Sequence, residues 1–180
     1  VGVVSYTEFV EIELAEPMEV EKAALALDAA LPRGIRVLAA DAVDTHHTAL
    51  MSQAAGASYR VTLPYSKDVS AAVAEFNAAP ELLFKKAAPK TKAKFKEIDV
   101  KFYIPQLTAE QTEKETIFSF DCKITPTGSM KAVDLLNALN EQYGLALPVE
   151  MADIERLRLY RNNKNGKPIP MLNSDAVTLG

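Results

Sequence analysis

The chain has 180 residues, of which 48% are hydrophobic and 24% are charged, and its formal net charge at pH 7 is −4. These proportions are typical of a folded domain, and the apolar runs are too short for a membrane span, which excludes a disordered or membrane-spanning chain. A single cysteine, Cys122, excludes an internal disulfide and a cysteine-cluster zinc site. We therefore expect a cytoplasmic protein with no membrane contact. Because Val1 is neither methionine nor the start of a signal peptide, we also expect the chain to begin partway into a longer polypeptide.

The charge is distributed unevenly. Residues 1–60 hold four basic and nine acidic side chains, whereas residues 61–180 hold sixteen basic and fifteen acidic ones. Six lysines fall between Lys85 and Lys96 with no acidic residue among them. A partner responds to the charge within a Debye length of about 8–10 Å, so the acidic average conceals a basic segment.

The first predicted elements in chain order form a strand–helix–strand unit. Apolar and acidic residues alternate strictly over 8–14, which predicts a half-buried strand. Alanine and leucine dominate 19–31, which predicts a helix, and the apolar segment 35–43 predicts the next strand. A short helix is expected near 48–55. We interpret 1–56 as one half of a first folding unit.

The pattern then starts again. Strands are predicted over 58–63, 82–88, 95–104, 115–124 and 154–161, and helices over 66–79 and 130–143. Strand–helix–strand followed by strand–helix–strand is the ferredoxin-like plan, an antiparallel sheet with its helices on one face. The predicted fold class is therefore α+β, with the half-unit 1–56, a full ferredoxin-like unit over 57–161 that contains an inserted basic hairpin, and an irregular tail over 162–180.

Several segments also match a known family in their order and spacing. They are VGVVSYTEFVEIEL (1–14), LDAALPRGIRVLAADAV (27–43), ASYRVTL (57–63), KTKAKFKEIDVKFYI (90–104) and IERLRLY (154–160). Together they resemble the domain of unknown function that is attached to, or encoded beside, bacterial cobalamin-binding radical SAM proteins. Members of that family open with a further strand, helix and strand, which this chain lacks. The resemblance implies an intracellular bacterial protein with a radical SAM, cobalamin-binding partner in cis or in trans, working on RNA or the translation apparatus, and it supplies no catalytic residues.

The lysine run is the strongest functional signal. It consists of Lys85, Lys86, Lys90, Lys92, Lys94 and Lys96. From 90 onward the lysines recur at every second position, so an extended chain places them on one side. We predict a basic finger at the sheet margin that contacts the phosphates of a nucleic acid. The alternative is an edge strand that lysines protect against pairing with another sheet.

A second basic element lies in the last predicted strand. Arg156, Arg158 and Tyr160 share one face, with the leucines between them facing the core. Together with Lys101 they extend the candidate nucleic-acid site onto the open face of the sheet, where tyrosine and arginine can stack on bases and hold phosphates. The alternative is an ordinary solvated face with acidic neighbours.

The remaining polar residues do not form a recognisable catalytic or metal site. His46 and His47 are adjacent and lack the spacing of metal ligands, so we interpret them as part of a helix start. Cys122 alternates with phenylalanines, which predicts a buried thiol. We expect no catalytic residue, no metal and no cofactor.

The expected function is that of a non-catalytic accessory module, which binds RNA or presents a substrate to the radical SAM partner. Two alternatives stay open. The chain could be an RNA-processing enzyme of repeated ferredoxin-like type that uses a histidine, or a protein-interaction domain whose acidic first sixty residues meet a basic partner.

Overall fold

The computed structural model describes residues 2–44, 46–87 and 94–179. The chain forms two compact units, each built from two separate stretches. Unit 1 comprises Val1–Glu8 and Ala55–Tyr160, and unit 2 comprises Phe9–Ala54 and Arg161–Gly180. The division into 1–56, 57–161 and 162–180 stays a prediction.

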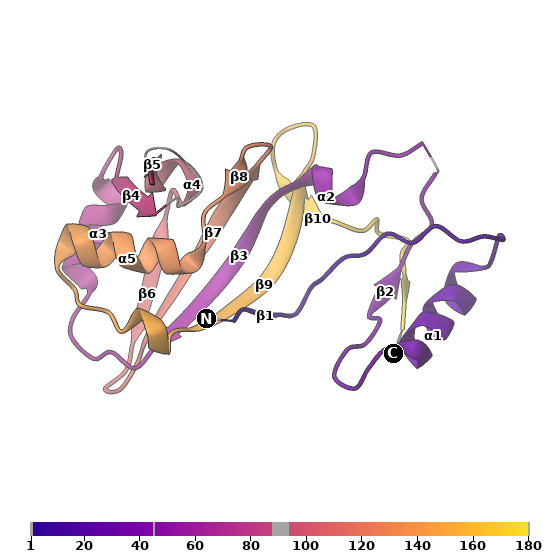
Figure 1. Ribbon diagram of the computed structural model, residues 1–180, viewed down its shortest axis with the longest axis horizontal. Coiled ribbons are helices and arrows are strands. Elements are labelled where there is room, and N and C mark those ends of the chain that lie inside the picture. The colour runs from indigo at the N-terminus through magenta and orange to yellow at the C-terminus, as the bar shows by residue number, and fades with distance from the viewer. Residues whose placement is uncertain (1, 45, 88–93, 180) are drawn as a thin grey trace. The chain divides into compact units, whose positions relative to one another are not determined.

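Unit 1 is built on one sheet with helices beside it. Its strands are β1 (Val4–Ser5), β3 (Ala54–Leu63), β6 (Leu107–Gln111), β7 (Thr116–Thr125), β8 (Gly128–Ser129) and β9 (Asp153–Asn162). Its helices are α3 (Ser70–Ala78), α4 (Val100–Tyr103), α5 (Ala132–Tyr143) and the short 3-10 helix η1 (Val149–Met151). The strands lie in the order β1-β9-β3-β7-β6 (Figure 1). Strand β7 is antiparallel to both β3 and β6, and β1 is parallel to β9.

The core of unit 1 follows from the alternation of side chains along its strands. On β3, Val61 and Leu63 are buried while Arg60 is not. Phe76 of α3 and Leu135 of α5 belong to the same core cluster as these strand residues. Both helices therefore pack on one face of the sheet, and each large apolar side chain buried there contributes about 1.5–3 kcal/mol.

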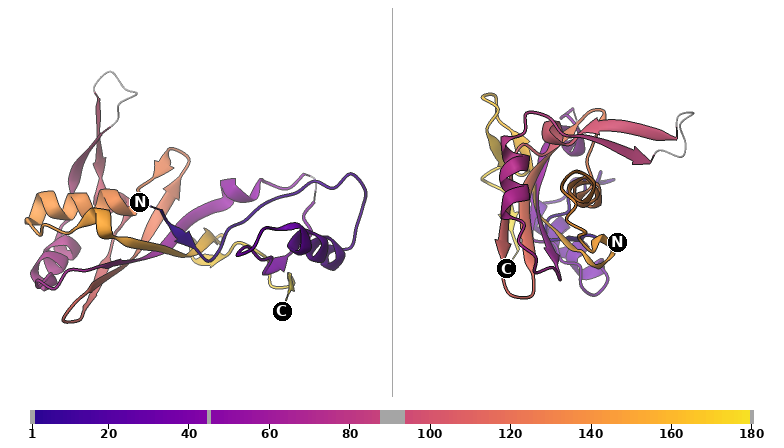
Figure 2. Two further views of the ribbon diagram at one scale, coloured as in Figure 1. Left: turned by 60° about the horizontal axis from the view of Figure 1, so that its bottom comes forward. Right: turned by 90° about the vertical axis from the view of Figure 1, so that its left-hand side faces the viewer.

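The basic hairpin is a separate two-stranded antiparallel sheet of β4 (Leu83–Ala87) and β5 (Phe95–Asp99). It extends beyond the helices and the main sheet of unit 1 in both views of Figure 2. Its base is held by the Asp99 carboxylate, which accepts the backbone N–H groups of Lys101 at 3.0 Å and Leu82 at 3.1 Å. A capping aspartate of this kind starts a helix, so α4 begins directly after β5.

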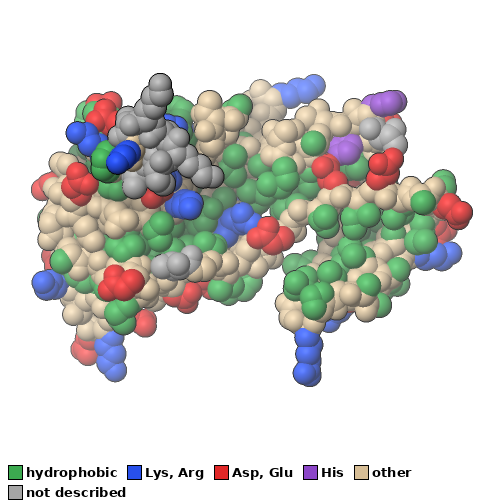
Figure 3. All heavy atoms as spheres, in the orientation of Figure 1, with side chains coloured by type: hydrophobic (Ala, Val, Ile, Leu, Met, Phe, Trp, Pro, Cys, Tyr) green, Lys and Arg blue, Asp and Glu red, His purple; other side chains and the backbone are tan. Residues whose placement is uncertain are grey.

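Unit 2 contains short elements and few buried side chains. The elements are α1 (Val20–Ala30), β2 (Ala39–Ala40), α2 (Leu50–Gln53), β10 (Pro168–Pro170) and β11 (Val177–Thr178), with β2 antiparallel to β11. Its exposed large apolar residues are Val10, Ile12, Leu14, Met18, Leu25, Ile35, Leu38, Val43 and Met51. Hydrophobic side chains accordingly cover much of the surface of this unit in Figure 3.

The predicted strand over 8–14 is wrong. Among the described residues this segment has no strand pairing, and Val10, Ile12 and Leu14 are exposed. Alternation places side chains on two sides of an extended chain, but a strand also needs a neighbour that accepts its backbone hydrogen bonds. The paired residues near this end of the chain are Val4 and Ser5 instead.

Three further expectations need correction. The predicted strand 95–104 ends at Asp99 because the carboxylate of that residue caps α4. The predicted strand 35–43 is reduced to β2, and the tail 162–180 contains β10 and β11. Strand β6 was not predicted at all.

The other predicted strands and helices are confirmed, with shifted ends, and the chain has the helices and multi-strand sheet of an α+β protein. Cys122 is buried on β7, as predicted. Among the helices within the described ranges, none has both the length and the apolar character of a membrane span.

Candidate nucleic-acid interface

The β4–β5 hairpin presents several lysines to solvent. Lys85 is exposed and lies across from Glu97, and Lys96 is exposed and lies across from Lys86. Lys94 enters β5 with a left-handed backbone (φ 59°) and is also exposed. The predicted site residues Lys90 and Lys92 lie outside the described residues.

Lys86 has a different environment from the other lysines of the hairpin. Its Nζ lies 2.5 Å from Oδ2 of Asp134, and the two side chains are only 31% and 12% exposed. Asp134 stands in the first turn of α5 and also accepts the backbone N–H of Lys131 at 3.4 Å. The ion pair therefore joins the hairpin to the start of α5.

The ion pair also offsets a local repulsion. Lys86 and Lys96 are directly opposite each other in the β4–β5 register, and like charges in that position destabilise a strand pair. The carboxylate of Asp134 compensates the charge of Lys86. Among the described residues, the positive charge that the hairpin offers to a partner is thus carried by Lys85, Lys94 and Lys96.

An open pocket of about 630 Å³ lies between the hairpin and α5. The hairpin contributes Phe84, Lys85, Lys86 and Phe95, and α5 contributes Asp134, Asn137, Asn140 and Glu141. Phe95 is 60% exposed, which is unusual for a phenylalanine. Positions 134, 137 and 141 recur at helical spacing, so α5 presents them along one side.

Lys101 does not join this surface as a free charge. Its Nζ donates to the carbonyl oxygen of Pro105 at 2.6 Å and lies 4.5 Å from the centre of the Phe76 ring. Burial lowers the pKa of the Lys101 ammonium, and the nearby Asp99 carboxylate opposes that shift. These contacts indicate a structural role at α4.

The two arginines of β9 have different neighbours. Arg156 donates to Ser5 Oγ at 3.3 Å and pairs with the carboxylate of Glu8, which fastens the N-terminal segment. Arg158 donates to Ser58 Oγ at 2.7 Å and lies 3.8 Å from Asp121 Oδ2.

Tyr160 is not the exposed stacking group that the sequence suggested. It is only 8% exposed, and the Arg158 guanidinium lies 5.4 Å from the centre of its ring. A buried ring cannot offer its face to a base, so this strand lacks the expected aromatic platform.

The predicted basic elements do not form one surface. Ser58 and Asp121, the partners of Arg158, alternate along their strands with core residues and so lie on the sheet face away from the helices. Lys86 instead approaches α5, on the helix-covered side. Lys86 and Arg158 are therefore on opposite sides of the sheet.

Phe95, Asn137 and Glu141 were missed in the sequence. A signal for Phe95 was present, because the residue lies between Lys94 and Lys96, and an aromatic residue among lysines is typical of nucleic-acid contacts. Asn137 and Glu141 carried no such signal, since they follow the ordinary polar pattern of an amphipathic helix.

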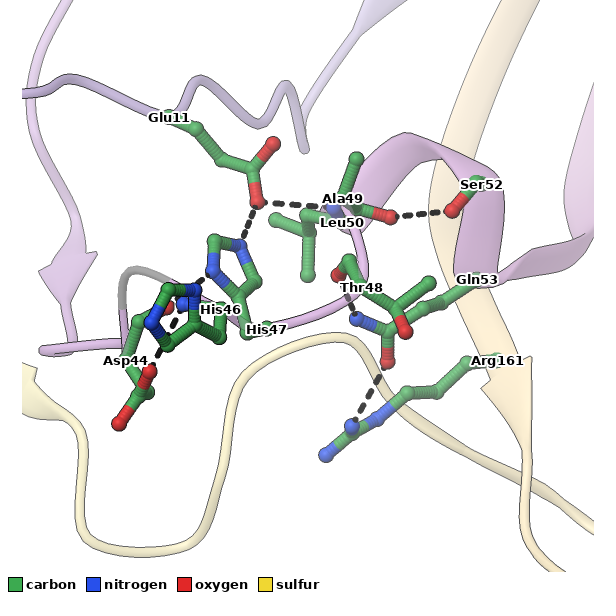
Figure 4. Close-up of polar contacts among 10 residues, drawn as sticks. All are labelled: Glu11, Asp44, His46, His47, Thr48, Ala49, Leu50, Ser52, Gln53 and Arg161. Carbon is green, nitrogen blue, oxygen red and sulfur yellow. Dashed lines mark hydrogen bonds and ion pairs between the residues drawn. The ribbon is translucent and has the colours of Figure 1, made fainter.

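A second polar cluster lies in unit 2 around His47 (Figure 4). The ring Nδ1 of His47 lies 2.5 Å from the backbone oxygen of Asp44, and Nε2 contacts the carboxylate of Glu11. Glu11 also accepts the backbone N–H of Leu50 at 2.8 Å. The hydrogen bond to Glu11 is the main cause that raises the pKa of His47, and the same bond lowers the pKa of Glu11.

This cluster is a clamp between two segments of unit 2. Both ring nitrogens of His47 face oxygen acceptors, which favours the doubly protonated imidazolium and leaves no free nitrogen for a metal or a substrate proton. Within 2–44, 46–87 and 94–179, no group of three or more potential ligands is placed to hold a metal ion. The interpretation of the histidines as a helix start needs revision, because α2 begins later, at Leu50.

Comparison with known proteins identifies one family. The family model described as "Uncharacterized protein conserved in bacteria (DUF2344)" matches residues 1–135, three quarters of the chain. No curated protein matches the chain.

Proposed function

The chain belongs to the DUF2344 family of uncharacterised proteins conserved in bacteria, and we propose that it is a non-catalytic module that binds RNA through the β4–β5 hairpin. One observation carries this proposal. A hairpin that extends from unit 1 exposes three lysines together with a phenylalanine, Phe95. Lysines supply point charges for phosphates, and an exposed aromatic ring supplies a stacking surface.

The same observation weighs against edge protection as the purpose of the lysines. Lysines that protect an edge need only repel another strand, and an exposed phenylalanine works against that purpose. Edge protection also does not require Lys86 directly opposite Lys96, because this placement creates a repulsion that the ion pair with Asp134 has to offset.

The test compares two variants with the same loss of charge. In the first, Lys85, Lys94 and Lys96 are replaced by Gln; in the control, the exposed Lys114, Lys164 and Lys167 are replaced by Gln. Binding of single-stranded RNA to the full chain is measured by fluorescence anisotropy over a range of salt concentrations. The hairpin variant should bind more weakly at every RNA sequence, and the slope of log K against log salt should fall by up to about 0.7 for each lost phosphate contact. Equal binding by both variants would refute the proposal.

We also propose the architecture and the cellular setting that the sequence suggested. The order β9-β3-β7-β6, with α3 and α5 between consecutive strands, supports a ferredoxin-like unit.

The proposed partner is a cytoplasmic radical SAM, cobalamin-binding protein, in cis or in trans. The module presents RNA or another substrate to it. This proposal rests on the sequence resemblance. Co-expression with such a protein encoded beside the chain, followed by size-exclusion chromatography, tests it: separate elution would count against the partnership.

A second candidate function is protein interaction through unit 2. The specific observation is that the apolar side chains of Val10, Ile12 and Leu14, at every second position of this segment, are all exposed. The segment has no strand pairing among the described residues. Exposed apolar residues beside acidic ones fit a partner with an apolar patch and basic surroundings. Ile12→Ser should then abolish co-elution with the radical SAM partner and leave RNA binding unchanged.

The enzyme alternative lacks support of this kind. It requires a histidine that is free to act as a general acid or base. His47 already uses both ring nitrogens in the clamp.

A further inference from the structure

We propose that the pocket between the β4–β5 hairpin and α5 holds one unpaired base of a single-stranded RNA, stacked on Phe95, with the base edge toward Asn137 and Glu141. This inference rests on the proposed RNA binding and adds the kind of RNA and the way in which a base is read. The lining combines two phenylalanines and two lysines of the hairpin with polar side chains of α5.

The size of the pocket and its exposure to solvent suit this ligand. A volume of about 630 Å³ is within the range of small-molecule sites, which span about 300–1,000 Å³. A base in a duplex has both faces covered, so only an unpaired base can place a face against Phe95. The exposed fraction of Phe95, 60%, leaves a ring surface on which such a base can stack.

Among the described residues, some polar side chains of the pocket have hydrogen-bond or ion-pair partners and others have none. The Asn140 amide is occupied, since it donates to the Leu147 carbonyl at 3.0 Å and accepts the Leu147 N–H at 2.7 Å. Asp134 is occupied by Lys86. Asn137 and Glu141 are exposed on the same side of α5, one turn apart, and are placed to meet a base edge.

The charged side chains of the pocket determine on which side the phosphate of the nucleotide lies. Lys85 lines the hairpin side and is exposed, so the phosphate lies there, and the carboxylates on α5 repel it from the opposite wall. An ionised Glu141 accepts hydrogen bonds but donates none. It therefore favours a base with an exocyclic amine, such as cytosine, over uracil, which presents a carbonyl at the same position.

The first experiment uses the absence of tryptophan from the chain. Phe95→Trp creates a single fluorescent reporter in the pocket, and Phe102→Trp, at another exposed phenylalanine of unit 1, is the matched control. Oligocytidylate should quench the fluorescence of the Phe95→Trp variant in a saturable titration and leave that of the Phe102→Trp variant unchanged. Equal responses of the two variants would overturn the inference.

The second experiment measures affinity and salt dependence together. Phe95→Ala should weaken oligocytidylate binding about 5- to 100-fold, as expected for a lost base–aromatic stack, with an unchanged salt slope because no phosphate contact is lost. Glu141→Gln should remove most of a preference of at least about fivefold for oligocytidylate over oligouridylate of equal length. Unaltered melting temperatures confirm that both variants fold.

The outcomes separate this inference from the proposed function. If the hairpin lysine variant loses RNA affinity but Phe95→Ala binds like the wild type, RNA binding stands and the base pocket is refuted. If the wild-type chain binds no RNA, both fail. If an oligoglutamate peptide binds as tightly as RNA and shows the same loss in Phe95→Ala, the ligand is an acidic peptide and the assignment of a base is overturned.

Discussion

The Lys86 ammonium nitrogen lies 2.5 Å from Asp134 Oδ2, across 48 residues of sequence, and this contact fastens the basic hairpin to helix α5. Both residues line the proposed pocket, while Lys85 and Lys96 are exposed. It consequently affects both the stability of the hairpin and the shape of the surface that RNA would meet.

Breaking this ion pair should destabilise the hairpin. In Asp134→Asn, Lys86 loses its counter-charge and still faces Lys96, so we expect a loss of about 1–2 kcal/mol in the free energy of unfolding, limited by the partial exposure of Lys86. Chemical denaturation measures the loss, and hydrogen exchange should show faster exchange in β4. Glu113→Gln, at an exposed acid of the same unit, is the control. Equal stability of the two variants would contradict the role of the pair.

Gly56 is required by the packing of Tyr160. A Cβ atom at position 56 would overlap the Tyr160 ring and hydroxyl group. Gly56→Ala should therefore cost about 1–3 kcal/mol of unfolding free energy, as overpacking usually does. Tyr160→Ala removes the obstacle, so the double variant should be more stable than the sum of the two single losses predicts. Strict additivity in denaturant titrations would show that the two residues do not meet.

The thiol of Cys122 should react slowly. Cys122 is buried, burial raises the pKa of its thiol, and its Sγ donates to the Met130 carbonyl at 3.5 Å. Since the thiolate is the reactive form, native protein should resist labelling by a disulfide reagent while denatured protein reacts at once. Cys122→Ala should cost about 1 kcal/mol of stability and leave RNA affinity unchanged. Rapid stoichiometric labelling of the native chain would show that the thiol is accessible.

The clamp between His47 and Glu11 should make unit 2 sensitive to pH. The folded state raises the pKa of His47, so its stabilising contribution is complete below the unfolded pKa of about 6.5 and is lost as the pH rises through the folded value. Glu11 has a lowered pKa, so its contribution is present above its unfolded pKa and is lost as the pH falls through its folded value.

NMR titration of the histidine ring protons tests this expectation. The chain has two histidines, so a His46→Gln variant assigns the signals. His47 should titrate above its ordinary value, and Glu11→Gln should lower its pKa. A His47 pKa at or below the ordinary value would show that the clamp does not form in solution.

Much of unit 1 was determined by local sequence. Alternation along 58–63 and 115–124 indicates which side chains face the core, and the same alternation is present in β3 and β7. The apolar stripe of 130–143 likewise corresponds to the buried side of α5. These features could be predicted because period 2 and period 3.6 are properties of the chain itself. The run of lysines in the hairpin can likewise be seen in the sequence without knowledge of the fold.

Contacts between distant residues were decided by the tertiary structure. The alternation over 8–14 could not show whether a neighbouring strand exists, and this segment has no strand pairing among the described residues. The strand pattern of 95–104 could not show that the Asp99 carboxylate would cap a helix and end β5. Nor could it show that Lys86 would find Asp134 while Lys85 stays exposed, or that Phe95 would line a pocket with α5. Periodicity specifies the side to which a residue points, but only the packed chain specifies what lies on that side.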